Sequence, residues 1–246
     1  LKREEPIVQE LANEYLTEQG ITILNDVTLN SVSNDGNKPV ITANGQNYTF
    51  DAVLYATGRK PNTANIGLEN TDITTNERGA IVVNDTCESS VPGIYAVGDV
   101  NGGPQFTYIS LDDFRIVFGA LTGNGQYTLK DRKNIPYTTF LTPPLARVGL
   151  TEEDAINKGY TVKTKEMLVA TMPRAHVNDY LKGAFKIVVN ADNDLILGAT
   201  LYSQGAEELI NLIKMAMDNN IPYTYFKNQI FTHPTMAENL NDLCNF

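Results

Sequence analysis

The chain has 246 residues and a formal net charge of −10, with 42% hydrophobic and 20% charged residues. This composition is typical of a globular protein, and no apolar run approaches the ~20 residues that cross a lipid bilayer. The acidic balance argues against nucleic acid as a partner, because phosphate recognition requires a basic surface. The two cysteines, Cys87 and Cys244, show no pairing pattern and no metal-ligand spacing, which suits a reducing cytoplasm.

In chain order, the first predicted elements are a helix and a small β meander. Apolar residues recur at helical spacing over 4–19, and Gly20 stands where a C-terminal helix cap belongs. Turns are predicted at 34–36 and 44–45, where asparagine and glycine cluster. The strands predicted in this part lie at 21–24, 27–32, 39–43, 46–50 and 52–55.

The rest of the chain predicts helices mixed with antiparallel strands. One helix is expected at 111–121, ended by glycine, and another opens at Thr151 with an acidic first turn that suits the helix dipole. A strongly apolar helix is expected at 206–217. The strands predicted here lie at 138–141, 165–171, 184–190 and 196–202.

The segment Phe231–Glu238 contains His233, one of only two histidines. An imidazole can exchange a proton near neutral pH, and a proline directly after it suits the first turn of a helix. Glu238 is close enough in sequence to orient the ring, which is the layout of a general acid–base pair. However, Thr235 and Glu238 also have the Thr-x-x-Glu spacing of a helix capping box, so the second interpretation is purely structural.

Three ordered motifs carry a family resemblance. They are the segment 51–62 with its Ala-Thr-Gly-Arg turn, the segment 93–100 ending in Val-Gly-Asp-Val, and the His-Pro-Thr box at 233–238. In this order and spacing they resemble the pyridine nucleotide–disulfide oxidoreductases, which include dihydrolipoamide dehydrogenase, glutathione reductase and mercuric reductase. The segment 106–115 looks similar to the bacterial branch near mercuric reductase that lacks its metal cysteines; some members of that branch reduce hypothiocyanous acid.

The resemblance implies an α/β plus α+β architecture, with the remainder of two Rossmann-like nucleotide-binding domains followed by an α+β dimerisation domain. Residues 1–57 would be the second half of the nicotinamide-binding domain, 58–126 the C-terminal part of the FAD-binding domain, and 127–246 the interface of a homodimer. The implied cofactors are FAD and NAD(P)H, the implied substrate is a small sulfur compound, and no metal is implied.

Asp99 and Gly98 follow a short apolar run, where an α/β sheet binds ligands. The resemblance assigns Asp99 a hydrogen bond to the ribityl chain of FAD, and the glycine lets the backbone approach the ligand. An Asx turn is the structural alternative. Thr57, Gly58 and Arg59 would pass near the adenine-nucleotide half of the flavin, although Arg59 suits a solvated ion pair equally well.

The helix that begins near Ile109 has two compatible interpretations. By resemblance, its N-terminus points at the flavin, where its partial positive charge would favour the anionic reduced form. Its apolar residues would form the core stripe. The predicted stripe comprises Leu111, Phe114, Val117 and Phe118. The other histidine, His176, has no partner nearby in sequence and is expected on the surface.

The family's two glycine-rich nucleotide turns and its redox-active Cys-x4-Cys pair are not in the sequence. We therefore expect the chain to be the C-terminal half of a longer enzyme and inactive by itself. In that enzyme, the resemblance makes His233 the general acid and base at the redox cysteines of the other subunit, with Glu238 orienting it. The alternative is a non-catalytic fragment or dimerisation module without flavin.

Overall fold

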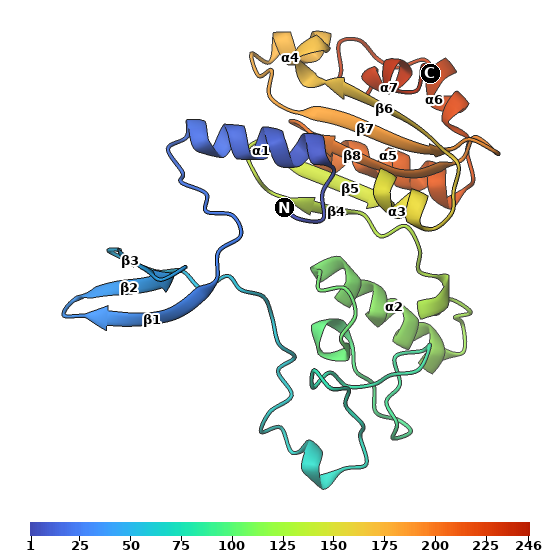
Figure 1. Ribbon diagram of the computed structural model, residues 1–246. Coiled ribbons are helices and arrows are strands. Elements are labelled where there is room, and N and C mark those ends of the chain that lie inside the picture. Colours follow the sequence, from blue (N-terminus) through green and yellow to red (C-terminus); the bar gives the residue numbers. More distant parts are fainter. The chain divides into compact units, whose positions relative to one another are not determined.

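The computed structural model describes residues 1–246, which form two compact units (Figure 1). One unit combines Leu1–Leu24 with Lys133–Phe246, and the other is Asn25–Arg132. The predicted domains, 1–57, 58–126 and 127–246, are assigned from the family resemblance and stay a prediction. None of the helices has both the length and the apolar character needed to cross a bilayer.

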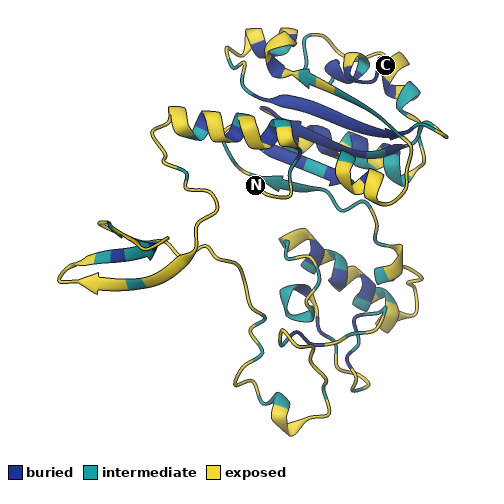
Figure 2. Ribbon diagram, in the orientation of Figure 1, coloured by how far each residue is buried: buried dark blue, intermediate teal, exposed yellow.

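A five-stranded antiparallel sheet organises the first unit, in the order β4-β5-β8-β7-β6. The central strands β7 and β8 form at the predicted residues, whereas β5 was not predicted. All seven residues of β7 are buried, so both faces of the sheet are covered (Figure 2). The strands are β4 (Tyr137–Thr139), β5 (Leu145–Gly149), β6 (Val162–Leu168), β7 (Ala184–Asn190) and β8 (Ile196–Tyr202).

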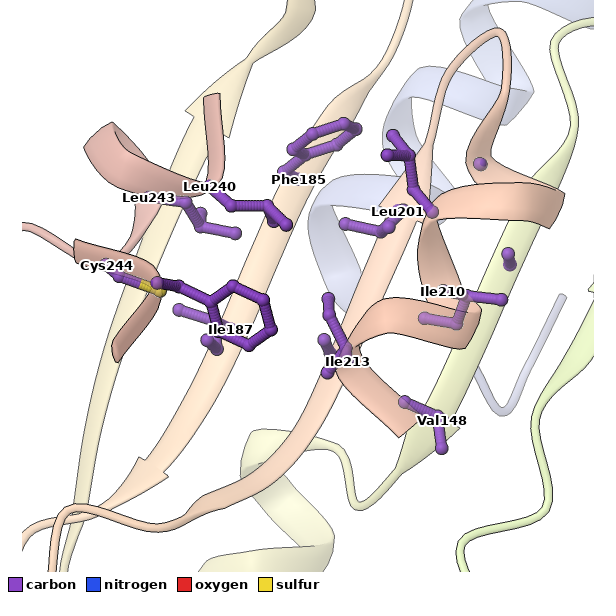
Figure 3. Close-up of a cluster of buried hydrophobic side chains, with 14 of the residues drawn as sticks. Val148, Phe185, Ile187, Leu201, Ile210, Ile213, Leu240, Leu243 and Cys244 are labelled. Carbon is purple, nitrogen blue, oxygen red and sulfur yellow. The ribbon is translucent and has the colours of Figure 1, made fainter. Parts of the chain in front are cut away.

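The main core lies on one face of this sheet. Helices α5 and α7 pack there against alternate residues of β5, β7 and β8, as the two-residue period of a strand requires (Figure 3). Phe185, Ile187 and Leu201 are fully buried in this cluster and contact the helices. The helices of this unit are α1 (Pro6–Glu18), α3 (Glu152–Asn157), α4 (Pro173–Val177), α5 (Ala206–Asp218), α6 (Tyr223–Asn228) and α7 (Asn239–Leu243).

Helix α1 covers the opposite face of the sheet. Its Val8 and Ala12 pack against Tyr202, and the Tyr15 hydroxyl accepts a hydrogen bond of 2.8 Å from the Gly183 amide. Gly183 has φ +121°, and a Cβ there would lie 1.7 Å from a backbone oxygen, so no larger residue fits. As predicted, Gly20 ends α1 with a left-handed backbone, φ +81°.

The second unit contains a three-stranded antiparallel sheet and one long helix. The sheet has the order β1-β2-β3, and the predicted turns at 34–36 and 44–45 connect its strands. Its elements are β1 (Leu29–Asp35), β2 (Lys38–Ala43), β3 (Gln46–Thr49) and α2 (Thr107–Thr122).

Two predicted strands, 21–24 and 52–55, do not form. Leu54 is 90% exposed and Tyr55 66% exposed, although their apolar run is typical of a buried parallel strand. A strand of this kind needs neighbours that pair with its backbone and cover its faces, and no segment of these 246 residues pairs with 52–55. The apolar run therefore lies open on the surface.

Helix α2 forms as predicted and ends at Gly123, but its predicted core stripe was wrong. The buried residues are Ile109, Asp113 and Ile116. Three members of the predicted stripe are at least half exposed: Leu111 (50%), Phe114 (54%) and Phe118 (56%). The helix thus buries its polar Asp113 and leaves apolar side chains exposed.

Candidate functional site

His233 lies in an irregular loop between α6 and α7, at 229–238. The prediction that His233–Pro234 opens a helix was wrong, because α7 begins only at Asn239. Before the helix, Thr235 holds the loop through local hydrogen bonds: its hydroxyl donates to the Thr232 carbonyl, and its amide donates to the Glu238 carboxylate.

The loop brings His233 and Glu238 together. The Nδ1 atom of His233 lies 2.7 Å from Oε2 of Glu238. The other oxygen, Oε1, accepts the Thr235 amide at 3.0 Å, and the Glu238 amide donates to the Thr235 hydroxyl at 3.2 Å. These last two bonds have the reciprocal geometry of a capping box, although α7 begins only at Asn239 and its N-cap is Glu238. The two interpretations of Glu238 are therefore compatible, since each uses a different carboxylate oxygen.

This geometry determines which ring nitrogen can exchange a proton. An ionised carboxylate only accepts hydrogen bonds, so the proton in the contact with Glu238 belongs to Nδ1 of His233. The His233 side chain is 68% exposed, whereas that of Glu238 is 19% exposed. The Nε2 atom is therefore the one able to give or take a proton from a bound molecule.

The bond from His233, supported by the Thr235 amide, lowers the pKa of Glu238 below its usual 4.5. A lowered folded-state pKa contributes stability above the unfolded-state value, and this contribution is lost as pH falls through the folded-state value. We expect Glu238→Gln to lose less stability than the wild-type chain as the solution is acidified. Thermal unfolding midpoints between about pH 6 and about pH 3 measure this difference. Parallel curves for the two proteins would contradict it.

The predicted flavin-side residues lie in the other unit. Arg59 and Asp99 form an ion pair of 3.1 Å, with side chains 67% and 42% exposed. Thr57 and Gly58 are exposed beside Arg59, and Gly58 has φ +117° with open space where a Cβ would stand. The structure thus brings 57–59 and Asp99 together, although they are forty residues apart in the chain.

Gly98 is required by the packing of its loop. It has φ +73°, and an added Cβ would lie 2.6 Å from Oγ of Ser110 on α2. Its amide donates a hydrogen bond of 2.7 Å to Oδ2 of Asp113. The short 3-10 helix Gly98–Asn101, which carries Asp99, is therefore held against α2.

The residues that sequence reasoning missed are those beneath this loop. Asp113 is fully buried and accepts from Gly98, from Asn101 at 2.9 Å, and from Arg132. Arg132, only 9% exposed, also donates to Asp112 at 2.7 Å. One feature of the sequence points to this network: Asp113 lies on the same helix face as Ile109 and Ile116. A charged residue at such a core position is buried only when it has a partner, so the sequence implies a partner for Asp113.

Both cysteines are buried and have free thiols. Burial raises the pKa of Cys87 to about 11 and that of Cys244 to about 12. We expect neither thiol to react with a thiol reagent at about pH 8 until the chain unfolds, because the thiolate is the reactive form. Counting modified thiols with and without denaturant measures this, and a thiol modified in the folded chain would contradict it.

Comparison with known proteins gives the relatives of this chain. Residues 1–113 match the pyridine nucleotide-disulphide oxidoreductase family, and residues 135–244 match the dimerisation domain of the same family. A probable pyridine nucleotide-disulfide oxidoreductase, RclA of Escherichia coli, is 43% identical over 99% of this chain and 55% of its own length. Mercuric reductase of Staphylococcus aureus is 36% identical over 97% of this chain and 44% of its own length.

A solved structure supports the same relationship. The HOCl-induced flavoprotein disulfide reductase RclA from Escherichia coli superposes with a TM-score of 0.95 at 42% identity, covering 99% of this chain and 56% of that one. The chain spans about half the length of the curated relatives that it matches.

These matches confirm the predicted fold class, with parts of two Rossmann-like nucleotide-binding domains followed by an α+β dimerisation domain. They also confirm the resemblance to the mercuric reductase-like branch. The family is one of FAD- and NAD(P)H-dependent enzymes. The chain belongs to the pyridine nucleotide-disulphide oxidoreductase family.

Proposed function

We propose that this chain is the C-terminal portion of an FAD-dependent NAD(P)H:disulfide oxidoreductase, acting on a disulfide or a related small sulfur substrate. The observation that carries the proposal is the 2.7 Å contact between His233 Nδ1 and Glu238, which leaves Nε2 on an exposed ring. A positioned imidazole with an orienting carboxylate is the arrangement of a general acid and base.

In this proposal, His233 moves the protons of thiol–disulfide exchange. A reduced cysteine thiol gives its proton to Nε2 as its sulfur attacks the substrate disulfide, and the leaving sulfur takes that proton back. Glu238 holds the ring in one tautomer and stabilises its cationic form in between. When bound, FAD supplies the two electrons that come from NAD(P)H.

The redox cysteines belong to other parts of the enzyme in this account. Cys87 and Cys244 are buried with raised pKa values, so neither suits an attacking thiol. We propose that His233 meets the redox cysteines of a second subunit, with residues 127–246 forming the homodimer interface. Free buried thiols also suit a protein that works in the cytoplasm.

The residues present fit a flavin. Asp99 offers a partly exposed carboxylate that can accept from a ribityl hydroxyl, and Gly58 leaves open space beside it in a left-handed backbone. Helix α2 starts at Thr107 without a side-chain cap, which favours negative charge nearby. We propose Thr57, Gly58, Arg59, Gly98 and Asp99 as the flavin-contacting residues of this chain, within a nicotinamide segment 1–57 and an FAD segment 58–126.

A second function is favoured by one observation. The two clusters of buried apolar side chains both lie in the unit built on the five-stranded sheet, and neither includes a residue of the flavin-side unit. In this second function, the chain is a dimerisation module that binds no flavin.

Expression of the whole open reading frame that contains this chain distinguishes the two functions. The proposed enzyme is yellow, dimeric, and oxidises NAD(P)H when given a disulfide. A colourless dimer without this activity would contradict the enzyme and support the module.

A further inference from the structure

The loop that carries His233 is closed at its base by one asparagine side chain. The Asn241 amide on α7 donates to the carbonyl of Phe226 at 2.7 Å and to that of Gln229 at 2.9 Å. It also lies 3.3 Å from the carbonyl of Lys227. A single side chain therefore joins the end of α6 to the start of α7, and the loop 229–238 lies between the two attachment points.

These bonds add to the backbone cap of α6. Many helices satisfy their last carbonyls through a following residue in the left-handed conformation. The residue after α6 is Gln229 with φ −71° and ψ 146°, which is extended, so this solution is not used. The Gln229 amide lies 3.4 Å from the Phe226 carbonyl, and the Asn241 amide adds its bonds to the carbonyls of Phe226 and Lys227. Asn241 thereby ties the chain that leaves α6 towards His233 to helix α7.

The other end of the loop is held by the same helix. The Asn239 side chain, 2% exposed, donates to the carbonyls of Thr235 and Met236 at 3.2 and 3.1 Å. Helix α7 is anchored in turn by the buried Leu240 and Leu243. The Glu238 side of the loop is therefore fixed by Asn239, and the His233 side by Asn241.

We propose that Asn241 is a positioning residue for His233, and this rests on the function proposed above. His233 and Glu238 meet only if both ends of the loop keep their spacing. Asn241 maintains this spacing from α7, without touching either side chain. Loss of its amide frees the His233 end of the loop, while the buried side chains of α7 keep the helix in place.

The test uses the full-length enzyme with Asn241→Ala, His233→Ala and the double variant. A misplacement of about 1 Å can cost up to ~10²-fold in rate, so we expect Asn241→Ala to slow the disulfide half-reaction by ~10–100-fold. Reduction of the flavin by NAD(P)H should not change. In the His233→Ala background, Asn241→Ala should cost nothing further, because it acts through His233. An additive loss would assign Asn241 a purely structural role and overturn the proposal.

Asn211→Ala is the matched control. The Asn211 amide also donates to backbone carbonyls, but within its own helix α5, to Glu207 and Glu208 at 3.0 and 3.4 Å. Its removal should leave the disulfide half-reaction unchanged. An equal loss in both variants would overturn the role of Asn241.

A second measurement requires neither the cofactor nor an active enzyme. Nitrogen-15 spectra of the 246-residue chain resolve two histidine rings, with His176 as the internal reference. We expect neutral His233 to carry its proton on Nδ1 in the wild-type chain and to become a tautomer mixture in Asn241→Ala, with His176 unchanged. An unaltered His233 spectrum would overturn the positioning role whatever the enzyme does. If His233→Ala has no effect on turnover, the proposed function fails, and the spectra still decide the role of Asn241.

Discussion

Replacing His233 by alanine in the full-length enzyme is expected to slow reduction of the disulfide substrate by ~10²–10⁴-fold. The substitution removes Nε2, the atom that we propose carries the proton, and leaves the Asp99–Arg59 region untouched because that lies in the other unit. Flavin content and flavin reduction by NAD(P)H should therefore be normal. Rapid-mixing measurement of each half-reaction separates these effects.

His176→Ala is the control for this substitution. His176 is an exposed histidine of α4, as predicted, and its Nε2 lies 2.8 Å from the Ala170 carbonyl, with no carboxylate to orient it. We expect both half-reactions to be unchanged. An unaltered disulfide half-reaction in His233→Ala, or an equal loss in His176→Ala, would contradict the assigned role.

Replacing Asp113 by alanine is expected to destabilise the second unit by ~3–5 kcal/mol. The substitution leaves the buried Arg132 with only Asp112 as its partner and removes the acceptor of the Gly98 and Asn101 donors. Two measurements report the loss of stability of this unit: hydrogen exchange of the α2 amides and urea denaturation. We also expect weaker flavin binding, because Asp99 lies in the loop that Asp113 holds.

Asp85→Ala provides the comparison for Asp113→Ala. Asp85 pairs with Lys130 on the surface, where the two side chains are 46% and 78% exposed. Exposed ion pairs contribute about 0–1 kcal/mol, so little change is expected. Similar losses in the two variants would contradict the view that the buried network supports the Gly98–Asn101 loop.

A strand could be predicted from the sequence when the strands that pair with it lie within the chain. The strands at 184–190 and 196–202 were predicted at their observed limits, because each pairs on both edges and lies in the core. The run at 52–55 is also apolar, yet nothing in these 246 residues pairs with it. Hydrophobic pattern indicates a tendency to be buried, and it does not reveal what will cover the segment.

The candidate site shows the same distinction at the level of side chains. The contact between His233 and Glu238 is local, so spacing was enough to predict it. Asn241 and Arg132 act over 12 and 19 residues, on backbone carbonyls and on a buried carboxylate, and no spacing rule identifies such partners. The roles of Thr57 to Arg59 and of Asp99 stay predictions that a bound flavin would test.

Mixed dimers test the central claim, that His233 serves the redox cysteines of the other subunit, most directly. One subunit carries His233→Ala, and the other carries serine in place of its redox cysteines, so each homodimer is inactive. In the mixed dimer, one site combines an intact histidine with intact cysteines only if the two come from different subunits. The account predicts that activity reappears at one of the two sites, and an inactive mixed dimer would contradict it.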